Sequence, residues 1–181
     1  MRFIVFAVLA VASVSAVAAG SVDLNLSNHT VESHYATSAG NAQVSLGGLY
    51  NEDNRNWFAD VGLLAAGETE AGGSRFDAGL GGRLYAVHAG GKDLLALGLG
   101  GQLRWWPGNR SFAVGGYGFY APNVVTFGDG EKFSDLGLRA EIELVRNSTL
   151  YAGYRWIKAE LNNNTSPYVD KGAFVGIRIE F

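Results

Sequence analysis

Acidic and basic residues recur at every second position in several segments of this chain, which places them on one face of an extended strand. In the segment 133–145, Asp135, Arg139 and Glu141 share one parity, and leucine, alanine and isoleucine occupy the other. The same parity test assigns these charged residues to one interior face: Asp60, Asp77, Arg83, Arg104, Asp135, Arg139, Glu141, Glu143, Arg155, Arg178 and Glu180.

Two kinds of chemistry are open to such a face. Its arginines and acids are nearly equal in number, and charges in a weakly hydrated interior must be paired and hydrogen-bonded. This balance predicts a paired network that fills the lumen of a barrel. The alternative is a polar constriction that selects small solutes, because rings of charge tune passage through a pore.

A second group of reactive types lies between residues 29 and 34, where His29, Glu32, Ser33 and His34 occur together. A serine beside a histidine base can act as a nucleophile. Neighbours on an extended segment point to opposite faces, however, so Ser33 and His34 cannot pair directly. We expect these residues in a solvated outer loop or strand end, and we expect no enzymatic activity. A lipid- or lipopolysaccharide-modifying enzyme, or a binding module acting through the outer loops, remains the alternative.

Other ligand chemistries have weaker support in the sequence. Asp129, Glu131 and Asp135 surround a glycine-rich turn, but they supply too few oxygen ligands for calcium at the required spacing. The chain has no cysteine, which removes thiolate metal sites. Its formal net charge is −3 without a basic run, which argues against nucleic-acid binding. We therefore expect no catalytic residue, no metal site and no cofactor.

The elements that position the charged face are short alternating segments. Period-two alternation with turn residues between the segments is typical of barrel strands. The expected strands are 22–27, 30–37, 43–50, 57–66, 75–87, 94–106, 111–121, 133–145, 149–157 and 171–181. These make ten, and merging segments would give eight. The faces of 111–121 stay unassigned, because Phe112 and Val114 give one parity while Tyr117 and Phe119 give the other.

The last strand, 171–181, has one wholly apolar face and ends in Phe181. Closure of a barrel must pair it with the strand that begins at Val22. Short turns after 106 and 145 and longer loops after 121 and 161 place the C-terminus on the periplasmic side. Aromatic girdles are then expected at both membrane surfaces, formed on the periplasmic side by Phe76, Trp105, Phe112 and Phe181 and on the outer side by Tyr50, Trp57, Tyr154 and Trp156.

Together these patterns predict an all-β, closed antiparallel transmembrane barrel with one domain over 20–181. Residues 1–19 have the charge, apolar run and small residues of a cleaved signal peptide. We expect localisation in the bacterial outer membrane, with outer-membrane lipids, lipopolysaccharide and the barrel-assembly machinery as partners, the last through the strand ending at Phe181. A secreted β-sandwich or lipocalin-like barrel is the alternative, and its apolar face would point inward.

Four stretches, 21–28, 120–125, 128–131 and 151–155, resemble the YfaZ family of small bacterial outer-membrane proteins. The resemblance covers essentially the whole chain after the signal peptide. It implies the barrel fold and the outer-membrane location, and it implies no chemistry for particular residues. The function we expect is a structural barrel or a narrow, porin-like channel with a charged lumen.

Overall fold

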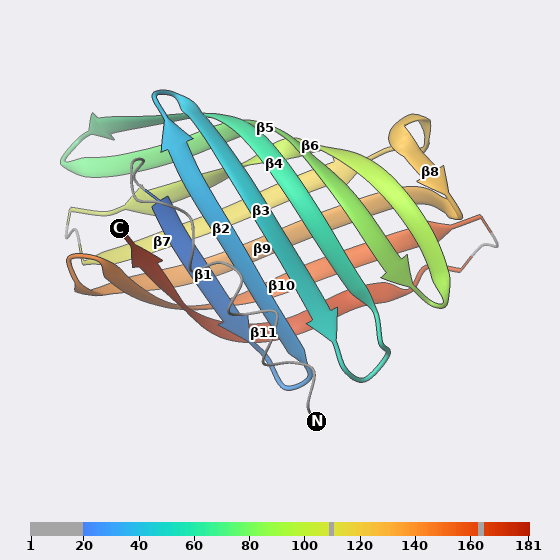
Figure 1. Ribbon diagram of the computed structural model, residues 1–181. Helices are drawn as coiled ribbons and strands as arrows, with labels where there is room; N and C mark the ends of the chain where they lie inside the picture. The colour runs from blue at the N-terminus through green and yellow to red at the C-terminus, as the bar shows by residue number, and fades with distance from the viewer. Residues whose placement is uncertain (1–19, 109–110, 163–164) are drawn as a thin grey trace.

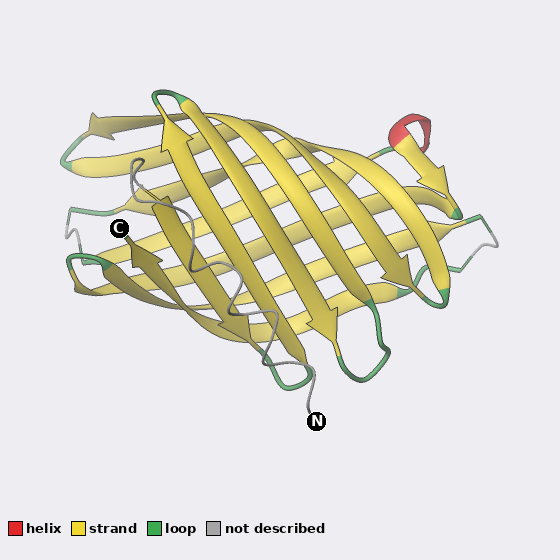
Figure 2. Ribbon diagram, viewed as in Figure 1, coloured by secondary structure: helices red, strands yellow, loops and turns green. Residues whose placement is uncertain are grey.

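A computed structural model describes residues 20–108, 111–162 and 165–181 of the 181-residue chain. Strands form nearly all of this part, together with one turn of 3-10 helix (Figure 2). The expected signal peptide, 1–19, lies outside the described residues. The elements are β1 (Gly20–Leu26), β2 (Thr30–Ala39), β3 (Ala42–Asn51), β4 (Trp57–Ala71), β5 (Ser74–Ala89), β6 (Lys92–Trp106), β7 (Phe112–Ala121), η3 (Asn123–Val125), β8 (Thr126–Gly128), β9 (Gly130–Val145), β10 (Ser148–Leu161) and β11 (Tyr168–Glu180).

Ten strands close into an antiparallel barrel, as the alternation predicts (Figure 1). Successive strands pair side by side, β5 pairs with β6, and β1 pairs with β11 to complete the cylinder. The closing pair aligns Asp23 with Arg178 and Leu24 with Ile177, so the two strands share the same inward and outward parity. The predicted pairing of the last strand with the first is confirmed, and the strand number is ten rather than eight.

The short segment β8 continues the path of β7 along β6. β7 pairs with the second half of β6, from Leu99 to Trp105, and β8 pairs with residues 94–96 near the beginning of β6. Pro122, which has no N–H, interrupts the ladder between them, and the Val125 N–H donates to its carbonyl at 3.0 Å. The stretch 122–132, expected to be one long loop, therefore contains η3, β8 and the beginning of β9.

The two ends of the barrel differ. Gly20 and Phe181 exchange backbone hydrogen bonds of 2.9 Å at one end, which also carries the turns 40–41, 72–73 and 146–147 and the connection from β6 to β7. We call this end the terminus-side rim. The opposite end carries the connections 27–29, 52–56, 90–91, 122–129 and 162–167, and we call it the loop-side rim. Two-residue turns occur at both rims, where Gly72 and Gly73, like Gly90 and Gly91, have the positive φ angles that a type I′ hairpin requires.

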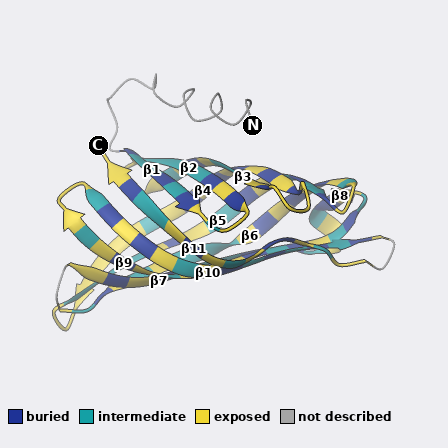
Figure 3. Cartoon of the chain, turned by 90° about the horizontal axis from the view of Figure 1, so that it is seen from below, coloured by how far each residue is buried: buried dark blue, intermediate teal, exposed yellow. Residues whose placement is uncertain are grey.

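The outer surface of the barrel is apolar across its middle. Leu63, Leu80, Leu99 and Leu138 are 60 to 73% exposed, and buried and exposed residues alternate along the strands (Figure 3). Among described strand residues, charged side chains of the outward parity occur only near the loop-side rim: Asp93, Lys132, Lys158, Glu160 and Lys171. Because the apolar face points outward, the β-sandwich and lipocalin-like alternatives are wrong.

The strands are longer than a membrane requires. β5 and β9 have 16 residues and β10 has 14, whereas about 9 to 11 tilted residues cross a bilayer. Their loop-side ends can therefore project beyond the apolar band. In the described part of the chain, no helix is long and apolar enough to cross a membrane, a finding that concerns helices alone.

Inward glycines make room for inward rings. A Cβ on Gly137 would lie 2.4 Å from the Tyr117 ring, and one on Gly153 would lie 2.7 Å from the Phe174 ring. Each glycine lies on a strand next to the one that carries the ring. This packing resolves the faces of β7, whose inward positions include Tyr117 and Phe119 and whose outward positions include Phe112 and Val114. Both faces are apolar, which is why parity alone could not assign them.

Candidate functional site

The interior of the barrel is the candidate site, and its first part is a cluster at the seam between β1 and β11. Arg178 donates to the two carboxylate oxygens of Asp23 at 2.9 and 3.1 Å. A carboxylate oxygen of Glu141 lies 2.6 Å from Nε of Arg139 and 3.3 Å from Nε of Arg104. Its other oxygen lies 3.8 Å from Arg178. The cross-strand pair of Asp23 and Arg178 therefore joins the closing strands to charges on β6 and β9.

A smaller group continues this cluster toward the terminus-side rim. Nε of Arg75 lies 3.2 Å from Asp77, which also accepts a hydrogen bond of 3.1 Å from the Trp106 indole. The Arg75 guanidinium lies 4.8 Å from the centre of the Trp106 ring. Arg104 reaches Asp77 at 3.8 Å and connects the two groups.

A buried ion triad occupies the middle of the barrel. Arg155 is fully buried and donates to Glu32 from β2 and to Asp170 from β11. The remaining acceptor positions of the two acids are filled by side chains nearby: Asn25 at 2.7 Å and His34 at 3.0 Å on Glu32, and Thr30 at 2.8 Å and Asn51 at 3.0 Å on Asp170. A buried ion group requires such additional hydrogen bonds to its charged atoms.

The expectation of a solvated loop or strand end is wrong for the residues around Glu32. The segment forms β2, in which Glu32 and His34 face the interior while Ser33 takes the outward parity. His29 remains at the loop-side rim, where Nδ1 lies 3.1 Å from Asp53. Ser33 and His34 thus lie on opposite faces of the barrel wall, as the parity argument predicts, and form no nucleophile–base pair.

A third charged group lies deeper, beside Arg83. The Tyr85 hydroxyl donates to Asp135 at 3.0 Å, and Asp60 has an oxygen 3.8 Å from His34. Arg83 is 9% exposed and lies over the Phe119 ring, 4.3 Å from its centre. Aromatic faces attract a guanidinium, so Arg83 is stabilised here without an ion pair to a described residue.

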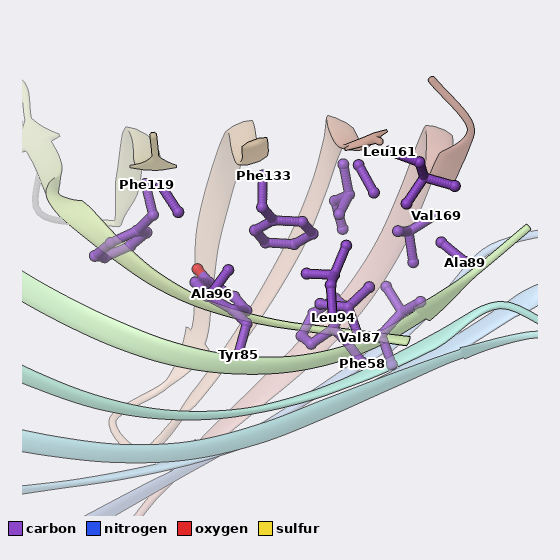
Figure 4. Packing of buried hydrophobic residues seen from close by; sticks show 14 of the residues in the cluster. Phe58, Tyr85, Val87, Ala89, Leu94, Ala96, Phe119, Phe133, Leu161 and Val169 are labelled. Atoms are coloured by element: carbon purple, nitrogen blue, oxygen red, sulfur yellow. The ribbon is translucent and has the colours of Figure 1, made fainter. Parts of the chain in front are cut away.

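An apolar layer fills the interior on the loop side of these charges (Figure 4). Its main side chains come from β3 to β7 and β9 to β11, and we define the layer by these residues: Leu49, Phe58, Tyr85, Val87, Leu94, Phe119, Phe133, Ile157, Leu161 and Val169. All are at most 5% exposed. A bulge in the pairing of β10 with β11 turns both Val169 and Asp170 inward, the first to this layer and the second to Arg155.

A cavity of about 850 Å³ occupies the rest of the interior. Its wall includes Gly40, Asn41, Asn147 and Phe181, which lie at the terminus-side rim, so the cavity opens there. At its inner end the wall includes Glu32, His34, Arg83, Tyr117 and Phe174. None of the residues that define the apolar layer lines it. Within the described part of the chain, the cavity is open at one rim and blocked toward the other.

The structure brings most of the predicted interior charges into these groups. Asp77, Arg104, Arg139, Glu141 and Arg178 lie in the cluster near the seam and rim, whereas Asp60, Arg83, Asp135 and Arg155 lie deeper. Glu143 and Glu180 have the inward parity but lie near the terminus-side rim, where Glu180 is exposed.

The residues assigned to aromatic girdles take the outward parity, and Phe181, just beyond the end of β11, also borders the mouth of the cavity. Phe76 stacks on Trp105 with ring centres 6.5 Å apart, and Phe181 stacks on Tyr35 at 6.4 Å, both toward the terminus-side rim. Toward the loop side, the ring centres of Tyr154 and Trp156 are 4.6 Å apart. Tyr50 and Trp57 are cross-strand partners there, and Phe112 begins β7 at the other rim.

Sequence reasoning missed several members of the site. Asp23 and Asn25 could have been found, because they alternate with Val22, Leu24 and Leu26 in β1. Arg75 has the same parity as Asp77. Asp170 carried no usable pattern, since its inward direction depends on the bulge. In the described part of the chain, no three His, Asp or Glu side chains are grouped to hold a metal ion.

Comparison with known proteins gives a family and a distant likeness. The family model described as "YfaZ precursor" matches residues 1–181. No curated protein matches the chain. Among solved structures, the chain is similar to the outer membrane channel DcaP of Acinetobacter baumannii, with a TM-score of 0.41 and 13% identity over 93% of this chain and 55% of that one. The present chain thus spans about half the length of that channel.

Proposed function

This chain belongs to the YfaZ family, and we propose that it is an exported barrel of the bacterial outer membrane whose interior is a periplasm-facing cavity, closed on the cell-surface side. The outward apolar band supports the membrane location, since large exposed leucines on every side would be unstable in water. Lipids and lipopolysaccharide would cover this band, and the assembly machinery would recognise β11 and Phe181.

The orientation follows from the two rims. Barrels of this class have short periplasmic turns and longer outer loops. The terminus-side rim has mostly two- to five-residue turns, whereas the loop-side rim carries the excursion 122–129 and the loop 162–167. Exterior charges such as Lys132 and Glu160, 3.1 Å apart, also gather at the loop-side rim, beyond the apolar band. We therefore place the loop-side rim at the cell surface.

The closed form rests on one observation, the apolar layer between the cavity and the cell-surface rim. Barrels of about eight strands are filled by side chains, and wide aqueous pores need about sixteen. Ten strands leave room for a cavity, and here the room lies on the periplasmic side alone. The charged groups then serve as the paired core that supports the cavity wall. A narrow channel is the second candidate, and it requires the apolar layer to move.

Planar-bilayer recording of the refolded protein tests this proposal. We expect no steps of unitary conductance, because ions cannot cross a dry apolar layer. Frequent steps from the wild-type protein would favour the channel and overturn the closed form.

The absence of cysteine allows a second test of orientation and access. Ser38→Cys places a thiol on the cavity wall near the terminus-side rim, and Glu52→Cys places a matched thiol in an exposed loop at the other rim. An impermeant maleimide should label Glu52→Cys in whole cells and Ser38→Cys only after the outer membrane is permeabilised. Labelling of Ser38→Cys in whole cells would contradict the proposed orientation or the closed layer.

A further inference from the structure

Arg83 differs from the other arginines on the cavity wall. Arg75, Arg104, Arg139 and Arg178 each lie within 3.3 Å of a carboxylate oxygen. Arg83 is 9% exposed and forms no ion pair within 4.0 Å with a described carboxylate, and its Nε has no hydrogen-bond partner. Buried guanidinium groups need acceptors for their N–H donors. The inner end of the cavity therefore holds a cation without an ion-pair partner among the described residues and with an unused Nε donor.

The two acids that balance the charge of Arg83, Asp60 and Asp135, do not accept hydrogen bonds from it. Asp135 accepts the Tyr85 hydroxyl, and Asp60 lies closest to His34 among the cations of the described residues. Neither Asp60 nor Asp135 lines the cavity, whereas Arg83 does. The two carboxylates thus lie outside the cavity wall, and neither forms an ion pair or hydrogen bond with Arg83.

Two aromatic rings lie beside the Arg83 guanidinium. Phe119 lies 4.3 Å from the guanidinium carbon and Tyr117 lies 5.9 Å from it. A ring offers a guanidinium its π face and no hydrogen-bond acceptor, so these contacts stabilise the charge of Arg83 without using its donors. The planar fork of a guanidinium matches the oxygens of a carboxylate or phosphate.

A second unused donor lies beside the first. Ser45 is 6% exposed and lines the cavity, and its hydroxyl has no hydrogen-bond partner. A Cβ on Gly62 would lie 2.4 Å from Ser45 Oγ and 3.4 Å from Arg83 Nε. The Arg83 Cγ would lie 3.0 Å from the same Cβ, so the absence of a side chain at Gly62 allows the Ser45 hydroxyl and the Arg83 side chain to lie next to each other.

We propose that Arg83 and Ser45 form a binding site for the oxyanion group, carboxylate or phosphate, of a small solute that enters the cavity from the periplasm. The site rests on the proposed function, because the solute reaches it only if the cavity opens on that side. The cavity volume of about 850 Å³ is in the range that holds small-molecule ligands.

Calorimetric titration of the protein, refolded in detergent micelles, tests the site with acetate, inorganic phosphate and neutral acetamide as probes. We expect acetate or phosphate to bind and acetamide not to bind, and the stronger of the two anions identifies the group preferred. Arg83→Gln should weaken binding at least about tenfold, since hydrogen bonds to charged groups are strong. Arg75→Gln, an arginine near the rim that is paired with Asp77, should change it less than about twofold.

Two further variants keep the test decisive if Arg83→Gln fails to fold. Gly62→Ala preserves the charge, but its methyl would collide with the Ser45 hydroxyl and the Arg83 stem and displace both, and Ser45→Ala removes only the hydroxyl. Both should weaken binding, the first more strongly. Heat-modifiable gel migration shows which variants are folded. The proposal is overturned if the wild-type protein binds neither anion, or if Arg75→Gln weakens binding as much as Arg83→Gln. Either result would leave the maleimide labelling pattern unchanged, so failure of this site is distinguishable from failure of the periplasm-facing cavity.

Discussion

Arg155 shows how a single residue connects distant strands. It is the largest fully buried side chain among the described residues, and its two acids come from β2 and β11. Taking one partner from a buried ion group leaves an uncompensated charge, which costs more than the group itself contributes. The integrity of the barrel interior should therefore depend strongly on this residue.

Replacement of Arg155 by leucine is expected to destabilise the barrel by about 3–5 kcal/mol, because Glu32 and Asp170 would then face each other as buried like charges. The free energy of unfolding can be measured by urea titration in lipid vesicles, followed by tryptophan fluorescence. Lys158→Gln provides the control, since its 3.1 Å pair with Glu160 is partly exposed and worth about 0–1 kcal/mol. Equal effects of the two substitutions would show that the triad is not a structural centre.

Individual residues of the site differ in how far the sequence could locate them. Parity placed Arg83 and Arg155 on the inward face, because each lies inside a strand with regular alternation. Glu32 and His34 belong to a weakly alternating segment with polar residues on both faces, so their direction depended on pairing with β1 and β3. The stacking of Arg83 on Phe119 involves strands that are far apart in sequence, and alternation carries no signal for it.

At the scale of elements, inward glycines provide the room that aromatic rings on neighbouring strands occupy. Gly137 on β9 faces Tyr117 on β7. A Cβ on Gly176 of β11 would lie 2.5 Å from the Tyr151 ring on β10. Alternation predicted the ten strands because it depends on one strand at a time. It could not predict which rings fill which glycine gaps, since that depends on register between strands.

Gly137→Ala should destabilise the pairing of β7 and β9 by about 1–3 kcal/mol, because the added methyl overlaps the Tyr117 ring. Gly172→Ala is the matched control on β11: a Cβ there has no neighbour within 4 Å, and the loss of chain freedom in the unfolded state should leave stability unchanged or slightly higher. The same urea titration measures both variants. A Gly137→Ala protein as stable as wild type would mean that the Tyr117 ring can move aside at no cost.

The whole molecule combines a uniform exterior with a divided interior. The exterior is apolar around the cylinder, whereas the interior changes from charged to apolar along its length. The sequence alone does not predict this division. Tyr85 and Val87 follow Arg83 on the inward parity of β5, so apolar and charged residues share one face of the strand. That the apolar ones form a layer depends on the pairing of ten strands, which places them side by side. The division gives the barrel a direction, with the cavity opening at one rim and the apolar layer lying toward the other.

Removal of two rings from the apolar layer should convert the closed barrel into a conducting one. Phe119 lies against Arg83 at the inner end of the cavity, and Phe133 packs on Tyr85 with ring centres 4.7 Å apart. Phe119→Ala combined with Phe133→Ala is expected to cost about 3–5 kcal/mol for each ring, so heat-modifiable migration must first show that the barrel forms. Planar-bilayer recording should then detect unitary steps that the proposed closed form does not give, because water can enter the space beside the charged groups. Leu136→Ala combined with Leu138→Ala removes two side chains of comparable size from the exterior of β9 and should remain silent. A folded double-phenylalanine variant without conductance would show that the seal does not depend on these two rings.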